Sequence, residues 1–67
     1  MITAIGIAAG DIWHYLDEHG RVLFSDITKD IDKPRDLLLM SLGWLAREGH
    51  VKVEQLDKNC YVELTKK

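Results

Sequence analysis

The fold of this 67-residue chain is decided by one stretch, Pro34-Arg35-Asp36-Leu37-Leu38-Leu39-Met40-Ser41-Leu42-Gly43-Trp44-Leu45-Ala46-Arg47-Glu48, which Gly49 follows. Pro34 suits the first position of a helix, where no backbone N–H is needed, and Gly49 suits the left-handed residue that ends one. Asp36 near the start and Arg47 near the end carry the charges that the two ends of a helix dipole favour. The stretch therefore predicts a helix that begins at Pro34 and ends before Gly49.

This helix carries two apolar stripes when its residues are spaced at about 100° each. The stripe that we expect to face the core consists of Leu38, Leu42 and Leu45. The other lies on roughly the opposite side and consists of Leu37, Met40 and Trp44. A helix in a small domain needs one such stripe, so we expect the second to be the surface that binds a partner, either a protein partner or a second copy in a homodimer.

The second stripe has another explanation, in which the chain covers it itself. The N-terminal residues could fold back, and Ile2 would then lie over part of Trp44. In that case the stripe would belong to the core, because a soluble monomer does not usually expose a patch of this kind.

The first helix is predicted from about Ile5 to Glu18 and is ended by His19-Gly20. Its expected core-facing residues are Ile5, Ala9, Ile12, Trp13 and Leu16, and its expected outward residues are Asp11, His14, Tyr15 and Glu18. Gly6 and Gly10 leave room for another backbone. Two explanations remain open for these glycines: they fit a crowded bundle within the chain, or they form a helix-packing seam between chains.

The remaining elements are short. Residues 21–24 predict a small strand, Ser25 a hydroxyl cap, and residues 26–31 a two-turn helix with Ile27 and Ile31 facing inward. After Gly49 the apolar period changes to two, which predicts a β-hairpin. Its inward residues are expected to be Val51, Val53, Cys60, Val62 and Leu64, and its turn Asp57-Lys58-Asn59.

Helix, short strand, short helix, long helix and hairpin follow one another in the order of a winged helix-turn-helix. Two strings carry a closer resemblance: Ala9-Gly10-Asp11-Ile12-Trp13 with Leu16, and Leu42-Gly43-Trp44-Leu45-Ala46-Arg47-Glu48. Over residues 5–65 the chain resembles a small prokaryotic winged-helix family of unknown function. The resemblance implies an α+β winged helix-turn-helix, with three helices, a small antiparallel sheet and a C-terminal hairpin wing, as one domain over residues 1–67. It implies a fold of the DNA-binding, transcription-regulator type and no reaction or ligand.

Composition restricts the classes of function. Cys60 is the one cysteine, so an internal disulfide is excluded, and no apolar run reaches the roughly 20 residues that span a bilayer. We therefore expect a cytoplasmic protein that does not act at a membrane. His14, His19 and His50 lack metal-ligand spacing, and the serines have structural explanations. We expect no catalytic residue, metal, cofactor or small-molecule substrate.

The alternative function is that of a DNA-binding regulator acting as a homodimer. The cations available to contact phosphate are Lys33, Arg35, Arg47, Lys52 and Lys58. Acidic residues accompany them, and the outward positions of the long helix hold Leu39, Met40, Gly43 and Trp44, none of which makes a bidentate contact with a base. The charge of −2 lacks the basic excess typical of nucleic-acid binding, so any DNA binding should be weak.

Overall fold

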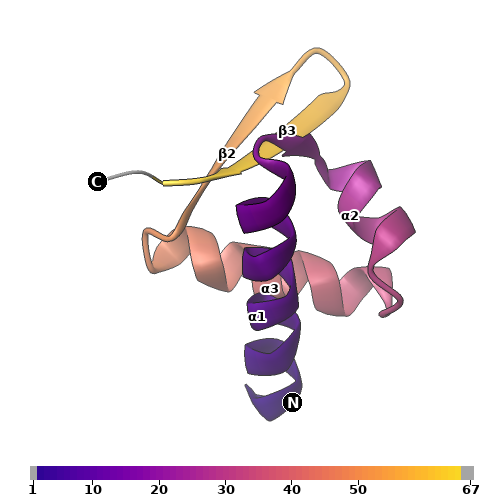
Figure 1. Ribbon diagram of the computed structural model, residues 1–67, viewed down its shortest axis with the longest axis vertical. Helices are drawn as coiled ribbons and strands as arrows, with labels where there is room; N and C mark the ends of the chain where they lie inside the picture. The colour runs from indigo at the N-terminus through magenta and orange to yellow at the C-terminus, as the bar shows by residue number, and fades with distance from the viewer. Residues whose placement is uncertain (1, 66–67) are drawn as a thin grey trace.

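The computed structural model describes residues 2–65 and has three helices and a three-stranded antiparallel sheet (Figure 1). The elements in chain order are α1 (Ile2–His19), β1 (Val22–Leu23), α2 (Phe24–Asp30), α3 (Arg35–Arg47), β2 (Val51–Leu56) and β3 (Asn59–Leu64). α1 crosses α3, α2 lies beside them, and the β2–β3 hairpin extends past the C-terminal end of α1. The predicted α+β winged helix-turn-helix is confirmed.

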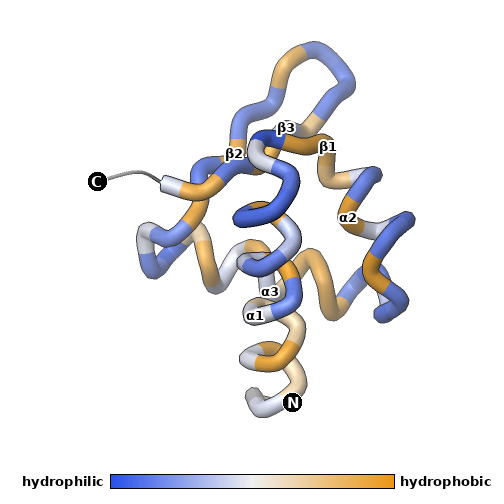
Figure 2. The backbone as a smooth tube through the Cα atoms, viewed as in Figure 1, coloured by the Kyte–Doolittle hydropathy of each residue, from blue (hydrophilic) through white to orange (hydrophobic). Residues whose placement is uncertain are grey.

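α1 is longer than predicted at its N-terminal end, where its first turns project beyond α3 (Figure 1). Figure 2 shows that this half of the helix is mostly apolar, whereas most of the hydrophilic residues of α1 lie in its second half. Ala8, Ala9, Ile12 and Leu16 are buried, as a single core-facing stripe requires. Gly20, at φ +75°, ends the helix in the left-handed region that glycine favours.

Two aromatic residues of α1 face other directions than predicted. Trp13, expected in the core, has 38% of its surface exposed. Tyr15, expected in water, is half-buried against the core, and its hydroxyl donates a hydrogen bond to Asp30 of α2. Both residues lie at the borders of the buried stripe, so the helical period alone could not decide which of them turns inward.

The second element also differs from the prediction. β1 has two residues and Phe24 already belongs to α2, where it is buried. Ser25 is not the cap; instead the Asp26 carboxylate accepts a 3.2 Å hydrogen bond from the Leu23 N–H. An acidic residue in the first turn of a helix serves this purpose well because it also meets the positive end of the helix dipole.

The predicted long helix is α3, with Pro34 as the residue before it and Gly49, at φ +79°, after it. Its predicted inward stripe is confirmed: Leu38, Leu42 and Leu45 are at most 3% exposed. Ser41 is also buried, and its hydroxyl donates a 2.7 Å hydrogen bond to the Leu37 carbonyl, so no polar group is left unpaired there.

The sheet order is β1-β3-β2, with Val62 opposite both Val22 and Val53. Asp57, at φ +54°, makes the turn of the hairpin. Val51 and Val62 are buried, whereas Val53, predicted to face inward, is 45% exposed. The reason is that Val53 lies on β2, an edge strand of the sheet, whereas its partner Val62 lies on the central strand β3.

One core joins all these elements. Besides the residues already named from α1, α3 and the hairpin, it includes Phe24 and Ile27 of α2, with Ile31 partly buried beside it. In residues 2–65, no helix combines the length and the apolar content that crossing a bilayer requires.

Candidate interaction surface

The face of α3 that points away from the core is apolar. Because Leu38, Leu42 and Leu45 face the core, the helical period turns the positions between them outward. The exposed fractions there are 48% for Leu39, 44% for Met40 and 47% for Trp44. Three large apolar side chains thus lie in water on one helix. We call Leu39, Met40 and Trp44 the outer face of α3.

The outer face is not the same set as the predicted stripe. Met40 and Trp44 belong to both. Leu37 is half-buried and packs against the core, so it contributes mainly to the fold. Leu39, recognised in the sequence only as an outward position, is the most exposed of the three.

Trp44 also borders a shallow, mostly apolar groove between α1 and α3. The groove is lined by Gly6, Ala9, Gly10, Trp13, Trp44, Leu45 and His50. Trp13, displaced from its predicted core position, therefore lies with Trp44 on the same surface. The N-terminal chain continues as helix from Ile2, and 47% of Trp44 stays open to solvent. The predicted contact of Ile2 with Trp44 lies outside the described side chains.

The glycines of the helices have free space around them. A methyl group added at Gly6, Gly10 or Gly43 would meet no atom of the described residues within 4 Å, apart from its immediate backbone. For Gly6 and Gly10, the explanation that small residues fit a crowded bundle is therefore wrong. A helical glycine costs about 1 kcal/mol relative to alanine, and the packing of residues 2–65 supplies no compensating contact at these three positions.

Two of the cations predicted for DNA contact interact with other side chains of the chain. The Lys33 ammonium lies 3.3 Å from the Asp11 carboxylate, and the Arg35 guanidinium lies 5.5 Å from the centre of the Phe24 ring. Arg35 also lines a small hollow together with Lys58 of the hairpin turn.

The remaining candidates are apart from that hollow. Arg47 is in the last turn of α3, and Lys52 is on β2 beside Glu54 and Glu63. The five cations thus come from four segments, the turn before α3, α3 itself, β2 and the hairpin turn, and each of these segments also holds a carboxylate.

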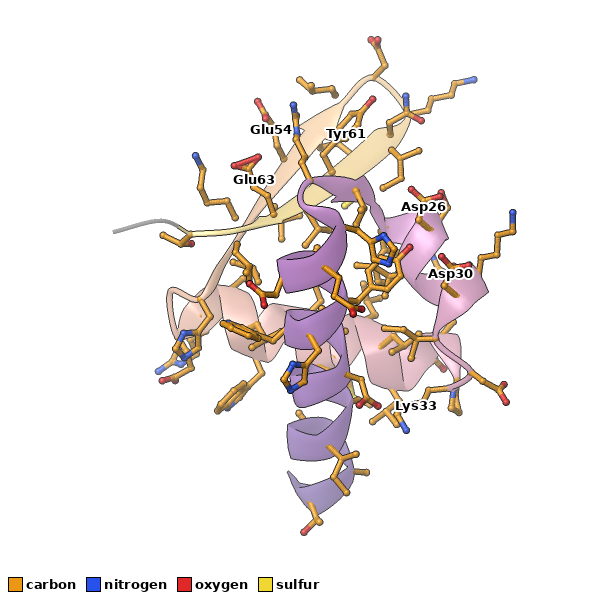
Figure 3. All side chains as sticks on the ribbon, viewed as in Figure 1. Asp26, Asp30, Lys33, Glu54, Tyr61 and Glu63 are labelled. Carbon is orange, nitrogen blue, oxygen red and sulfur yellow. The ribbon has the colours of Figure 1, made fainter. Side chains whose placement is uncertain are left out.

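A charged cluster that the sequence did not reveal fastens the start of β1 to the hairpin. The Arg21 guanidinium lies 3.0 Å from the Glu54 carboxylate and 3.6 Å from the Glu63 carboxylate. It also lies 4.4 Å from the centre of the Tyr61 ring. Figure 3 shows Glu54, Tyr61 and Glu63 side by side on the hairpin. Because these partners are 33–42 positions away in the sequence, no local spacing indicates the cluster. Its contacts are internal, so its role is structural.

Chemistry-bearing groups do not gather elsewhere in the part of the chain that the structure describes. Cys60 is half-buried on β3, in keeping with its predicted place in a strand. In residues 2–65, no three side chains of His, Cys, Asp or Glu come close enough together to hold a metal ion.

Three helices, the third with an open outer face, and a hairpin wing define a winged helix-turn-helix domain, which is a DNA-binding type of fold. The chain belongs to the family described as Winged helix-turn-helix domain (DUF2582), whose model matches residues 1–64. This confirms the family that the two sequence strings indicated.

The chain is similar to three proteins of different origin. The uncharacterized protein MJ1608 of Methanocaldococcus jannaschii is 38% identical over 63 residues, which cover 90% of this chain and 89% of that protein. The solution structure of protein BT2368 from Bacteroides thetaiotaomicron has a TM-score of 0.81 at 24% identity and covers 92% of this chain and 76% of its own. A structure of HOP2, described by its DNA recognition and protein interaction domains, has a TM-score of 0.74 at 24% identity over 85% of this chain and 97% of its own. At these identities the two structures show a shared fold.

Proposed function

We propose that this domain is a non-enzymatic, winged-helix association module that binds another protein through the outer face of α3. The single observation that carries the proposal is the exposure of Leu39, Met40 and Trp44 on one face of the helix that a DNA-binding winged helix inserts into the major groove. Trp is typical of interface hot spots, and Met adapts well to a partner surface.

The exposed part of Trp44 gives the scale of the gain on association. A tryptophan presents roughly 200–250 Å², so the open 47% amounts to about 100 Å². At about 25 cal/mol per Å², its burial contributes about 2–3 kcal/mol before the entropy of association is subtracted. Leu39 and Met40 add to this sum.

The alternative function, a homodimeric DNA-binding regulator, has two observations in its favour. The fold is of the DNA-binding type, and Arg35 and Lys58 line one hollow at the start of α3. Against it stand the apolar centre of the outer face and the mixed charge around it. A side chain reads a base edge by hydrogen bonds, which Leu39 and Met40 do not offer.

The experiment that tests the proposal measures molecular mass in solution by sedimentation, with and without duplex DNA, at salt concentrations from ~50 to ~200 mM. We expect a protein that self-associates or co-purifies with a protein partner. Its DNA binding should be weak, should not depend on DNA sequence and should have a shallow salt dependence, because few cations are free to displace counterions. A monomer that binds duplex DNA selectively and with sub-micromolar affinity at physiological salt would overturn the proposal in favour of the alternative.

A further inference from the structure

We infer that the partner is a second copy of this chain and that the two α3 helices pair antiparallel, with Asp36 facing Arg47 of the partner subunit and Met40 facing Gly43 of the partner subunit. The inference rests on the proposed function, because it names the occupant of the outer face of α3 and the register in which it binds.

Four residues lie along the middle of the exposed side of α3 at a symmetric spacing. Asp36, Met40, Gly43 and Arg47 are separated by four, three and four positions. At about 100° per residue they fall within an arc of roughly 60°, centred opposite the buried leucines. The spacing is the same when read from either end of the helix. This symmetry lets the four residues lie level with the same four residues of a second, antiparallel copy.

An antiparallel copy of this helix brings complementary residues together. A two-fold axis between positions 41 and 42 places each residue level with its counterpart on the antiparallel helix. Asp36 is then level with Arg47 of the partner subunit, and Met40 with Gly43 of the partner subunit. Both ends of the contact join opposite charges, and both central positions join a large side chain to a glycine. Leu39 and Trp44 lie on the two flanks, where the second helix also covers them.

The absence of a side chain at Gly43 serves no packing purpose within the described residues. A methyl group at this position would meet nothing within 4 Å among the described residues, and glycine weakens an exposed helix. In the antiparallel pair the missing side chain has a purpose, because it lets the neighbouring backbone approach and leaves space for Met40 of the partner subunit.

Asp36 and Arg47 carry the two charges on this line of residues. No ion pair joins Asp36 or Arg47 to another side chain of residues 2–65. Their positions in the first and last turns of α3 favour the helix dipole. A charge in either turn, however, would interact favourably with the dipole at any position around the helix axis. The dipole does not require both charges to lie on one line with Met40 and Gly43, as they do here.

Charge reversal tests the register directly. Asp36→Arg and Arg47→Asp each place like charges at both ends of the pair, so each variant alone should dimerise at least about tenfold more weakly than the parent. An equimolar mixture of the two variants should restore dimerisation as a heterodimer, because each contact then joins opposite charges. The double variant Asp36→Arg/Arg47→Asp should again form a homodimer.

The controls are Glu18→Arg and Lys52→Glu, which change the net charge by the same amounts at exposed positions off this line. Each control should dimerise with the same dissociation constant as the parent, and mixing the two controls should not strengthen dimerisation. Circular dichroism of every variant verifies the fold, and sedimentation equilibrium gives the dissociation constants.

Two results would overturn the inference, and they differ in what they leave standing. If the parent dimerises but the mixture of reversed variants does not recover, the register is wrong while association through the outer face remains. If the parent is monomeric up to about 1 mM, self-pairing is wrong, and binding to a different protein or to DNA is decided by the experiment on the proposed function.

Discussion

The Tyr15 hydroxyl donates a 2.6 Å hydrogen bond to the Asp30 carboxylate and thereby joins the C-terminal part of α1 to the last residue of α2. A carboxylate at the end of a helix meets the negative end of the dipole, which is unfavourable unless another group compensates. The Tyr15 hydroxyl is such a group. Lys33 in the turn after α2, paired with Asp11 of α1, makes a second link between α1 and this region of the chain.

Replacing Tyr15 by Phe should lower the free energy of unfolding by about 1 kcal/mol, the usual net value of one hydrogen bond at a partly open site. The ring remains and still packs against the core. Urea unfolding at neutral pH measures the difference. Tyr61→Phe is the matched control, because no hydrogen bond from the Tyr61 hydroxyl occurs in residues 2–65. Equal stability of Tyr15→Phe and the parent would contradict the link.

The same hydrogen bond makes stability depend on alkaline pH. The bond to Asp30, then burial and the negative charges of Asp30 and Asp26, raise the pKa of Tyr15 from its ordinary value of 10.0 to about 12. The folded chain therefore keeps a proton that the unfolded chain loses above pH 10. The contribution of Tyr15 is fully present below pH 10 and falls as the pH rises toward 12. The stability difference between the parent and Tyr15→Phe should shrink over this interval and be constant below it.

Leu42→Ala should be severely destabilising. Leu42 is 3% exposed in the centre of the buried stripe of α3, and truncation of such a leucine costs roughly 2–5 kcal/mol. In a domain this small, that is most of the stability available. Thermal unfolding followed by circular dichroism measures the effect. Leu39→Ala, on the exposed side of the same helix, is the control and should unfold close to the parent at low protein concentration.

Alanine substitutions at Gly43 and Gly49 should have effects of opposite sign on the isolated chain. Gly43 is in a helix with open space around it, so Gly43→Ala should stabilise the monomer by up to about 1 kcal/mol. Gly49 has φ +79°, where an added side chain is strained, so Gly49→Ala should destabilise by about 1 kcal/mol. Chemical unfolding at low micromolar concentration compares them. A destabilising Gly43→Ala would mean that the fold itself needs this glycine.

Charged residues on the outer face should abolish association and leave the fold intact. Met40→Lys and Trp44→Glu replace apolar side chains that are nearly half exposed, so little core packing is lost. The double variant should keep the parent's circular dichroism and sediment as a monomer. A variant that associates like the parent would place the interface elsewhere on the molecule.

Much of the fold could be predicted because α3 has unambiguous signals at both ends and a complete apolar stripe. Trp13 and Tyr15 could not be oriented, since each borders the buried stripe of α1. Tyr15 also makes a contact with Asp30, fifteen positions away, which local spacing does not indicate. Val53 was misjudged because alternation indicates a strand face but not how far the core reaches along it. Ser25 and Asp26 both had the chemistry of a cap, and only the position of the first helical turn distinguishes them.

The candidate surface was predictable in part. Met40 and Trp44 stood out because one helix carried more apolar residues than one core can use. Leu37 was assigned to that surface although it lies at its edge, where packing against neighbouring elements decides burial. The space around Gly43 could not be foreseen, because only the assembled fold shows which glycines have no neighbour.

The position of β3 in the middle of the sheet has a consequence for how the domain forms. Val62 pairs with Val22 on one side and Val53 on the other, yet β3 is the last of the elements along the chain. A nascent chain that has produced all three helices still lacks the strand that joins β1 to β2. Contacts between positions this far apart in the sequence form late and slowly. We therefore expect the sheet to form last, because β1 and β2 do not pair with each other and both depend on β3.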